Sequence, residues 1–431
     1  RRDFGTIGAP GFLFPRFRGS CMGGARALVV ALLLLSVAPI GGVAVADADI
    51  DASGENAALP QQTTESDRLM TVVAPGNTSE YLAPPPEEID RIDDRQTGLD
   101  VAAAVETDAR GLESAYLRTT LERRYEDAES AEERRAVLED GIDRLEDRVD
   151  EIRGTERTAI RRYGAGEIDT RELLWTLTVV TRGAGETDAT LEWLETAAVE
   201  AGADRVAERA AAEQVRLVPT DGPVRTRLVG VLTGSQPGRV HVETAGEGIV
   251  IATVDRTTDT YLREAYDPTA DEAGDRYREK PSPALERFGE LYPWSIDSFN
   301  SISVLGPEEA RLYRFGATHS HGNLETYLDG GSGDVVYERQ WINVAEVPSS
   351  NVGRTDGDLR IIATTTRAGG PLGITVRDAA TGDPLEADVR LNGEAVGSTA
   401  DGRLWIVAPR GSTTITATHD GETITLRTEF E

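Results

Sequence analysis

Cysteine is almost absent from this chain of 431 residues. Its single cysteine, Cys21, lies one residue before Met22, and we expect residues 1–21 to be a miscalled upstream extension. A chain that starts at Met22 carries no thiol, which excludes disulfide bonds, zinc–thiolate sites and cysteine nucleophiles. The length allows about two to four domains, so packing within each of them must supply the stability.

Lysine is almost absent too. Lys280 is the only one, so nearly all positive charge comes from arginine, and 75 Asp and Glu residues outweigh 45 Lys and Arg residues to give a net charge of −30. No block of basic residues occurs, which argues against a nucleic-acid partner. Molar salt shortens the Debye length to about 3 Å and screens such a charge. The composition resembles that of halophilic archaeal proteins, although an ordinary acidic, solvated surface would look the same.

Residues 22–48 have the features of a secretory signal peptide. Arg26 precedes an apolar run from Ala27 to Val37, and an Ala-x-Ala cleavage pattern follows at Ala44–Ala46. The run is short for a bilayer core of about 30 Å. No lipobox cysteine follows it and no second apolar segment occurs near the C-terminus, so we predict no anchor. We therefore expect a secreted or cell-surface protein that contacts the membrane only through this peptide, before cleavage.

Residues 49–97 are polar and include the run Pro84-Pro85-Pro86. This composition predicts a disordered linker without a core of its own. Asn77-Thr78-Ser79 within it matches the acceptor pattern for N-glycosylation, which makes Asn77 a candidate modification site.

Residues 98–216 have a helical pattern. Apolar residues at intervals of four and three form one stripe, and Ser130 with Glu133 is a capping box that starts this helix, with Gly164 as its stop. An earlier helix carries a stripe of its own, and two shorter helices are expected at Thr170–Thr181 and from Asp188 onward. Short turns favour antiparallel neighbours and hence a helical bundle or hairpin, with an oligomeric coiled coil as the alternative. The two stripes are Leu138, Ile142, Leu145, Val149 and Ile152, and Leu112, Leu117, Leu121 and Tyr125.

Residues 217–347 change from a helical to an alternating pattern, which predicts an α+β unit. A short helix is expected at 284–291, whereas 258–266 has no strong strand pattern. The glycines of Asp329–Asp334 can adopt the positive φ of a tight hairpin. Strands are predicted around 240–254, 310–317, 324–328 and 335–341.

The hairpin Glu325–Glu338 resembles the closing hairpin of PepSY-like domains, in which a strand ending in Asp is followed by a Ser/Thr-Gly-Asp/Glu-Val turn. The match covers about fifteen residues, and the turn here carries an extra glycine. The resemblance implies an α+β fold. It also implies a place among exported proteins, where some such modules are attached to peptidases as regulatory or inhibitory segments.

Residues 371–431 show short strands with turns at regular spacing, after a linker at 348–370. The pattern predicts a β-sandwich. The opening Asp378-Ala-Ala-Thr-Gly-Asp-Pro-Leu385 resembles carboxypeptidase-regulatory-like and related immunoglobulin-like domains. Such modules hold no catalytic residues, and the resemblance implies a spacer, packing or adhesive role.

His319 and His321 form the strongest candidate for chemistry. On one strand, residues two apart point to the same face, so two imidazoles there could share a zinc or copper ion. The other interpretation is a pair of strand or loop histidines without a metal. A catalytic zinc site needs a third ligand, for which the nearby candidates are His241, Glu243, Glu325 and Asp329.

No other catalytic signature occurs. The chain lacks a Gly-x-Ser-x-Gly elbow, an EF-hand spacing and a phosphate loop, so we predict no catalytic residue and no cofactor. The leading hypothesis is a non-enzymatic envelope or extracellular protein that acts through protein–protein interaction, with regulation of a protease as one form that this could take. The alternative is a metal-dependent hydrolase centred on His319 and His321.

Overall fold

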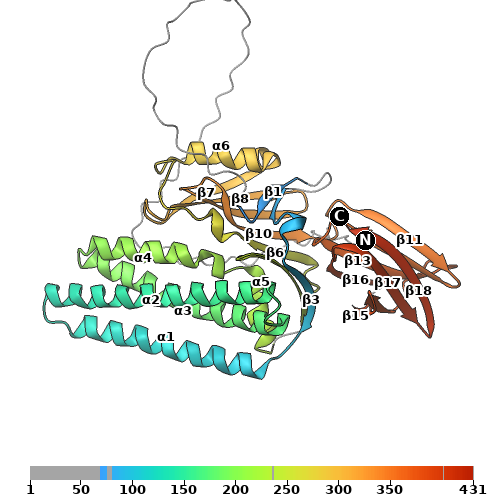
Figure 1. Ribbon diagram of the computed structural model, residues 1–431, viewed down its shortest axis with the longest axis horizontal. Coiled ribbons are helices and arrows are strands. Elements are labelled where there is room, and N and C mark those ends of the chain that lie inside the picture. Colours follow the sequence, from blue (N-terminus) through green and yellow to red (C-terminus); the bar gives the residue numbers. More distant parts are fainter. Residues whose placement is uncertain (1–67, 75–79, 235–236, 401, 431) are drawn as a thin grey trace, which may run out of the picture. The chain divides into compact units, whose positions relative to one another are not determined.

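A computed structural model describes residues 68–74, 80–234, 237–400 and 402–430 (Figure 1). The expected upstream extension, the signal peptide and the glycosylation candidate Asn77 lie outside these residues. Within them, a set of helices is followed by strand-rich parts, which confirms the predicted order of helical unit, α+β unit and C-terminal sandwich.

Five helices make up the helical part. Ser130 caps the second of them by accepting a hydrogen bond from the Glu133 N–H, as the capping box predicts. No helix in the described ranges is long and apolar enough to cross a membrane. The helices are α1 (Val101–Asp127), α2 (Ala131–Gly164), α3 (Thr170–Glu200), α4 (Asp204–Leu217) and α5 (Pro223–Leu232).

Helix α3 is the centre of the bundle, because it contacts α1, α2, α4 and α5. The prediction of two shorter helices in this region is wrong. The glycines that suggested a break lie inside one continuous helix, where Gly183 is buried and Thr187 donates to its carbonyl. Tertiary packing thus overrides the low helix propensity of glycine. The predicted stripe of α2 is buried along its whole length, whereas the stripe of α1 is buried only in part, since Leu112 is 74% exposed.

An antiparallel sheet of eight strands follows, in the order β3-β4-β5-β6-β10-β9-β8-β7. The predicted hairpin is confirmed by the pairing of β9 with β10, and the predicted short helix is α6 (Pro281–Leu291). The strands are β3 (Arg91–Thr97), β4 (Gly238–Ala245), β5 (Gly248–Asp255), β6 (Thr260–Tyr266), β7 (Phe299–Leu305), β8 (Leu312–His319), β9 (Gly322–Asp329) and β10 (Val335–Asn343). Short 3-10 turns lie at Pro86–Glu88, Val218–Thr220, Pro268–Ala270 and Pro293–Asp297, the last being η5.

Part of the predicted linker 49–97 is ordered structure. It contains β3 and a two-stranded sheet of β1 (Thr71–Val73) and β2 (Tyr81–Ala83). Distant groups hold this segment in place, for example through the Arg91 side chain of β3, which donates to the backbone carbonyls of Tyr163 and Ile168. The sequence also showed no strong strand pattern at 258–266, whereas the structure has strand β6 there. Arg263 and Glu264 are buried in β6, and their charges hide the apolar pattern of the strand.

The eight-stranded sheet is covered on both faces. One face packs against the bundle through Val240, Val242, Ile249, Ile251 and Leu262, which share one core cluster with residues of α2, α3 and α5. The other face packs against α6 and the two-stranded sheet through a second cluster, and against the C-terminal sandwich through a third that contains Tyr261, Ile342, Trp405 and Val407. The sheet is therefore the common layer onto which the other parts dock.

The C-terminal sandwich has two sheets of four strands with its own buried core. The predicted linker 348–370 is wrong, because β11 and β12 lie within it. Every residue of β11 is exposed, so the strand shows no apolar alternation and is held by its backbone pairing with β12. One sheet contains β11 (Ser350–Asp356), β12 (Leu359–Thr365), β13 (Pro371–Asp378) and β16 (Arg403–Val407), and the other β15 (Glu394–Ser398), β14 (Asp388–Leu391), β17 (Gly411–His419) and β18 (Glu422–Phe430).

Candidate functional site

The two predicted metal ligands lie together at the end of a hairpin, but not as two positions on one strand. His319 is the last residue of β8, and His321 lies in the turn before β9. The ring centroids are 4.0 Å apart with 51° between the planes, and Trp294 packs edge-on against His319 at 4.9 Å. The strand ends two residues before His321, so the expected same-face arrangement is not formed and a turn brings the rings together instead.

Both imidazoles are held in the neutral form. Burial, with a smaller contribution from the neighbouring His321, lowers the pKa of His319 to about 4, and burial also lowers the pKa of His321. Both ring nitrogens of His319 and Nε2 of His321 have no hydrogen-bond partner. No three His, Cys, Asp or Glu side chains gather as a metal site in the described part of the chain. The four predicted third ligands are thus not brought to this pair.

Two of those candidates form a different cluster, at the boundary between the eight-stranded sheet and the sandwich. Glu243 and His241 are both buried on β4, and His241 Nε2 lies 3.0 Å from Glu243 Oε1. Arg410, which follows β16, donates from Nε at 2.8 Å and from Nη2 at 2.9 Å to the two oxygens of Glu243. Burial would raise the pKa of Glu243, but the hydrogen bonds from His241 and Arg410 outweigh it and hold that pKa well below its usual range.

A second buried glutamate, Glu338 of β10, binds the N-terminal segment. Its carboxylate accepts hydrogen bonds from Arg263 Nη1 at 2.9 Å, the Leu82 N–H at 2.8 Å and the Tyr292 hydroxyl at 2.6 Å. Gln340 adds a fourth donor at 3.1 Å. Burial raises the pKa of Glu338, opposed by Arg263. These donors satisfy the carboxylate fully and join β2, α6 and the sheet.

A third buried glutamate, Glu264 of β6, binds the start of α5. Its carboxylate accepts from the backbone N–H groups of Val224 and Arg225 at 2.5 and 3.1 Å, where the positive end of a helix dipole favours an anion. The Arg225 side chain turns back to Glu264 at 3.2 Å and reaches Glu156 of α2 at 2.5 Å. Gly222 leaves the carboxylate room, because a Cβ there would lie 2.3 Å from the Glu264 side chain.

Glu325 and Asp329, the other two candidates, also have partners elsewhere. Glu325 pairs with Arg339 at 3.1 Å and Arg314 at 3.3 Å. Asp329 is the last residue of β9, and its carboxylate accepts from the Ser332 N–H in the turn that follows, at 2.6 Å. Burial raises the pKa of Asp329 to about 7. Neither carboxylate is left free to complete a metal site.

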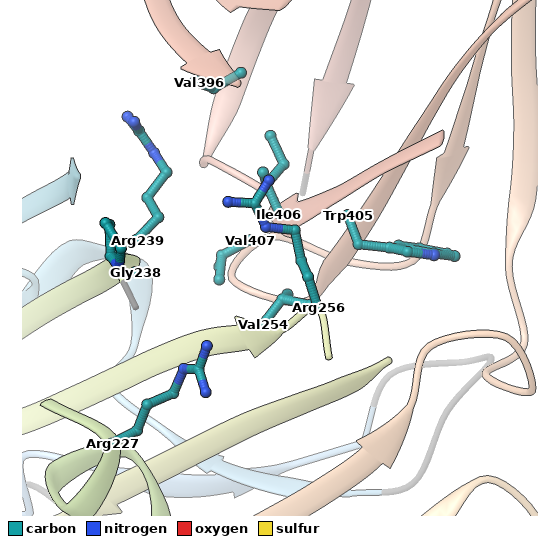
Figure 2. Close-up of a pocket in the computed structure, with 10 residues that line it drawn as sticks. Arg227, Gly238, Arg239, Val254, Arg256, Val396, Trp405, Ile406 and Val407 are labelled. Atoms are coloured by element: carbon teal, nitrogen blue, oxygen red, sulfur yellow. The ribbon is translucent and has the colours of Figure 1, made fainter. Parts of the chain in front are cut away.

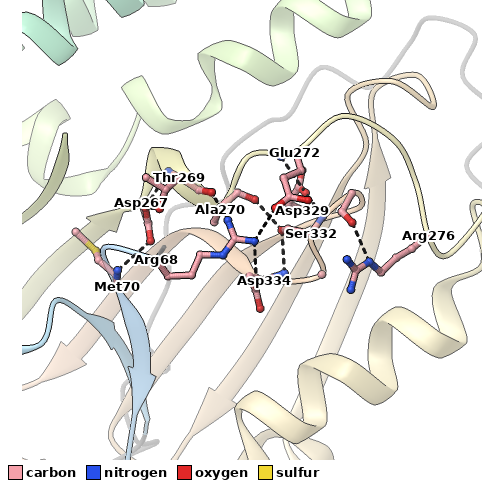
Figure 3. Close-up of polar contacts among 12 residues, drawn as sticks. Arg68, Met70, Asp267, Thr269, Ala270, Glu272, Arg276, Asp329, Ser332 and Asp334 are labelled. Atoms are coloured by element: carbon pink, nitrogen blue, oxygen red, sulfur yellow. Dashed lines mark hydrogen bonds and ion pairs between the residues drawn. The ribbon is translucent and has the colours of Figure 1, made fainter. Parts of the chain in front are cut away.

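The polar contacts around this turn also fix the start of the described chain (Figure 3). Arg68 pairs with Glu272 at 2.9 Å and with Asp334 at 3.1 Å, and the Met70 N–H donates to Asp267 at 2.9 Å. Gly331 lies so close to the neighbouring loop that a Cβ would be 2.1 Å from the Glu272 carbonyl. The extra glycine of the turn is therefore explained by close packing.

A small pocket lies between the eight-stranded sheet and the sandwich, lined by Arg227, Arg239, Arg256 and Trp405 (Figure 2). Its volume is about 20 Å³, which holds about one water molecule. Arg227 pairs with Asp255 at 3.0 Å, and Arg239 with Glu394 at 2.9 Å. The pocket is too small for an organic substrate.

The residues that join the parts of the molecule were not predicted from the sequence. Arg225, Arg263, Glu338 and Arg410 were overlooked because surface charge is the ordinary interpretation of an arginine or glutamate in so acidic a chain. A signal does exist for two of them. Arg263-Glu264 and Glu338-Arg339 are charged pairs placed between aromatic and aliphatic residues of strands, and such positions in a covered sheet are buried.

Comparison with known families divides the chain into three. Residues 22–237 match a domain of unknown function (DUF7096), residues 240–348 a family of unknown function (DUF7094), and residues 346–426 the archaeal fibronectin-III type-like domain. The last match supports the predicted immunoglobulin-like sandwich. No curated protein and no solved structure matches the chain. Because the first match spans half of the sequence, the chain belongs to the DUF7096 family.

Proposed function

We propose that this protein is an exported, non-enzymatic protein of the cell envelope or extracellular space that acts by binding other proteins. The observation that carries the proposal is the buried Glu243–Arg410 pair, through which the fibronectin-III type-like domain is joined to the sheet. A domain that served only as a spacer on a flexible linker would need no such joint. A fixed joint supports a role in which two neighbouring surfaces are presented together to one partner.

Further contacts support the same role. The Tyr261 hydroxyl donates to the Gly369 carbonyl at 2.5 Å, and Trp405 packs in a shared apolar cluster with Ile342 and Val347. The buried glutamates Glu243, Glu264 and Glu338 each accept several hydrogen bonds, as expected of groups with a structural role.

The finer features are part of the proposal. We infer that residues 22–48 direct export, that the acidic composition serves in a very salty medium, and that residues 217–347 are a PepSY-like unit. The resemblance of Glu325–Glu338 to the closing hairpin of such units supports a protease as the partner, with this region restraining its activity. Cell fractionation with N-terminal sequencing of the mature chain would test export; an intact Met22 in the cytoplasmic fraction would contradict it.

The test of binding is a pull-down at molar salt. The purified full chain is coupled to beads, incubated with an envelope extract and compared with its Arg410→Ala variant. We expect a reproducible protein that the wild-type chain retains and that the variant, whose sandwich is held less firmly to the sheet, retains less. Recovery of no protein above empty beads, or equal recovery of every protein by both chains, would count against the proposal.

The metal-dependent hydrolase remains the second candidate, on the observation that the His319 and His321 rings are close together and that three of their four nitrogens have no hydrogen-bond partner. It requires a third ligand from outside the described residues or from a partner. Stoichiometric Zn²⁺ or Cu²⁺ added to the purified chain should leave its melting temperature unchanged if no site exists. A rise of several degrees that is absent from His319→Leu would instead establish a site, because a ligand that binds only the folded state stabilises it.

A further inference from the structure

Strand β7 is an open edge of the eight-stranded sheet. It pairs with β8 on one side, and no strand pairs with its other side among the described residues. Asn300, Ser301 and Ser303 are exposed, and the rest of the strand is partly exposed. Its outer backbone groups are therefore available for a further strand.

The sequence of β7, Phe-Asn-Ser-Ile-Ser-Val-Leu, contains no charged residue. In a chain with 28% charged residues this is unusual for an outer strand. Charges commonly protect edges from pairing with other chains, and the opposite edge, β3, carries two arginines and two aspartates. The outer strands of the sandwich, β11, β15, β16 and β18, each carry at least one charged residue. Among the outer strands of the eight-stranded sheet and the sandwich, β7 is the exception.

Apolar side chains at this edge are only half covered. Phe299, Ile302 and Val304 pack against the core cluster beneath α6, yet each keeps exposed surface. Ile296, in the η5 turn directly before the strand, is 57% exposed. Chain added along β7 would extend this cluster and cover its open side.

We propose that β7 pairs antiparallel with β7 of a second copy of this chain, so that two eight-stranded sheets become one across a two-fold axis. The net charge of the chain favours the outer edge of β7 as the place where a second copy binds. Two copies that each carry −30 charges repel wherever their charged surfaces meet, whereas the β7 edge brings no charge opposite its copy. The half-covered apolar side chains are self-complementary across such an axis. Molar salt screens the remaining repulsion, so the dimer strengthens as salt is raised.

The first test is sedimentation of the purified full chain at several concentrations, in molar and in low salt. We expect a dimer in molar salt that weakens on dilution of the salt. Ser303→Asp places two carboxylates near each other at the junction and should weaken the dimer at least tenfold. Because Ser303 is exposed, the substitution should leave the melting temperature of the variant unchanged. The matched control is Asn351→Asp on the exposed edge strand β11, which should dimerise like the wild type.

A second test uses the scarcity of cysteine. In a Cys21→Ser background, Ser301→Cys and Ser303→Cys are oxidised separately, because directly opposed residues of paired strands have Cβ atoms about 4.5–5.5 Å apart. At least one should form a disulfide-linked dimer, and Asn351→Cys should not. A wild-type chain that stays monomeric at all concentrations in molar salt, or a Ser303→Asp variant that dimerises like the wild type, would overturn the proposal. Both tests use purified protein alone, so their outcome is independent of the partner proposed above.

Discussion

The helical bundle and the eight-stranded sheet both contain ion pairs of arginine with a carboxylate, but representative pairs from the two parts differ in their exposure to solvent. In the bundle, Arg124 pairs with Asp140 at 2.5 Å and both side chains are about 40% exposed. In the sheet, Arg263 and Glu338 are 3% and 0% exposed. Exposed pairs contribute little to stability, whereas a buried charge left without its partner is strongly destabilising. The exposed pairs of the bundle can therefore change freely, whereas a buried pair such as Arg263–Glu338 cannot.

Removing one member of a buried pair should have the largest effect. Arg263→Ala leaves the Glu338 carboxylate buried without its cation and also removes a donor to the Leu82 carbonyl. We expect a loss of about 3–5 kcal/mol in the free energy of unfolding, measured by denaturant titration in molar salt. Arg124→Ala is the matched control and should cost about 0–1 kcal/mol. Equal losses would contradict the distinction between the two regions.

Weakening the joint between the sheet and the sandwich should have the second-largest effect on stability. Arg410→Ala removes both hydrogen bonds to Glu243, and because Arg410 is 22% exposed, water can replace part of the interaction. We expect a loss of about 2–3 kcal/mol, together with faster amide exchange in β5 and β16. Arg410→Lys keeps the charge but cannot form the two-pronged contact, so it should recover only part of the loss. Unchanged exchange in both strands would show that the apolar contacts hold the sandwich without this pair.

The histidine pair predicts a pH dependence of smaller size. The pKa of His319 is about 4 in the folded chain, below its ordinary value of 6.5, so between these values the unfolded chain binds more protons. The contribution of His319 to the free energy of unfolding should be constant above about pH 6.5 and fall as the pH drops toward 4. His319→Leu should flatten this part of the curve. Identical slopes of wild type and His319→Leu between pH 4 and 6.5 would refute the prediction.

Asp329 should act in the opposite direction. Its folded pKa of about 7 lies above the ordinary 3.8, so the folded chain binds the extra proton between these values. Its contribution to the free energy of unfolding therefore falls as the pH rises from 3.8 to 7. Asp329→Asn, measured over the same range, should remove this decline, and a steeper decline in the variant would contradict it.

The smallest effect is expected from the bundle. Arg209 bridges Glu146 and Asp143, at 2.6 and 2.7 Å, on the surface between α4 and α2. Arg209→Ala should cost about 1 kcal/mol or less in low salt and less still in molar salt, because exposed pairs are screened. A cost above about 3 kcal/mol, on the scale of a buried pair, would remove the difference between the two regions.

The parts of the fold that were predicted from the sequence are those in which local pattern and environment agree. The stripe of α2, its Ser130 cap and the hairpin of β9 and β10 follow from apolar spacing and turn chemistry. Most errors lie where charges are buried or apolar residues are missing, and one lies in α3, where packing keeps glycines inside a continuous helix. β6 buries Arg263 and Glu264, β3 is held by carbonyls of the bundle, and β11 is wholly exposed.

Local sequence pattern was also insufficient to predict the candidate site. His319 and His321 do lie close together, but the end of β8 at His319 and the lack of a third ligand among the described residues depend on tertiary contacts. The glutamates at the junctions find partners in remote parts of the chain. Glu243, for instance, is 167 residues from Arg410, and no spacing rule connects them.

The bond from the Leu82 N–H to Glu338 spans 256 residues of sequence. A chain emerging from the ribosome therefore completes its first strands long before their partner exists, and the N-terminal segment must wait until most of the sheet has been made. Contacts of such long range slow folding, because the entropy of closing the chain is lost before the contact forms. Docking of β1 and β2 would then be a late step, and a nascent chain truncated before Glu338 would leave this segment open to protease.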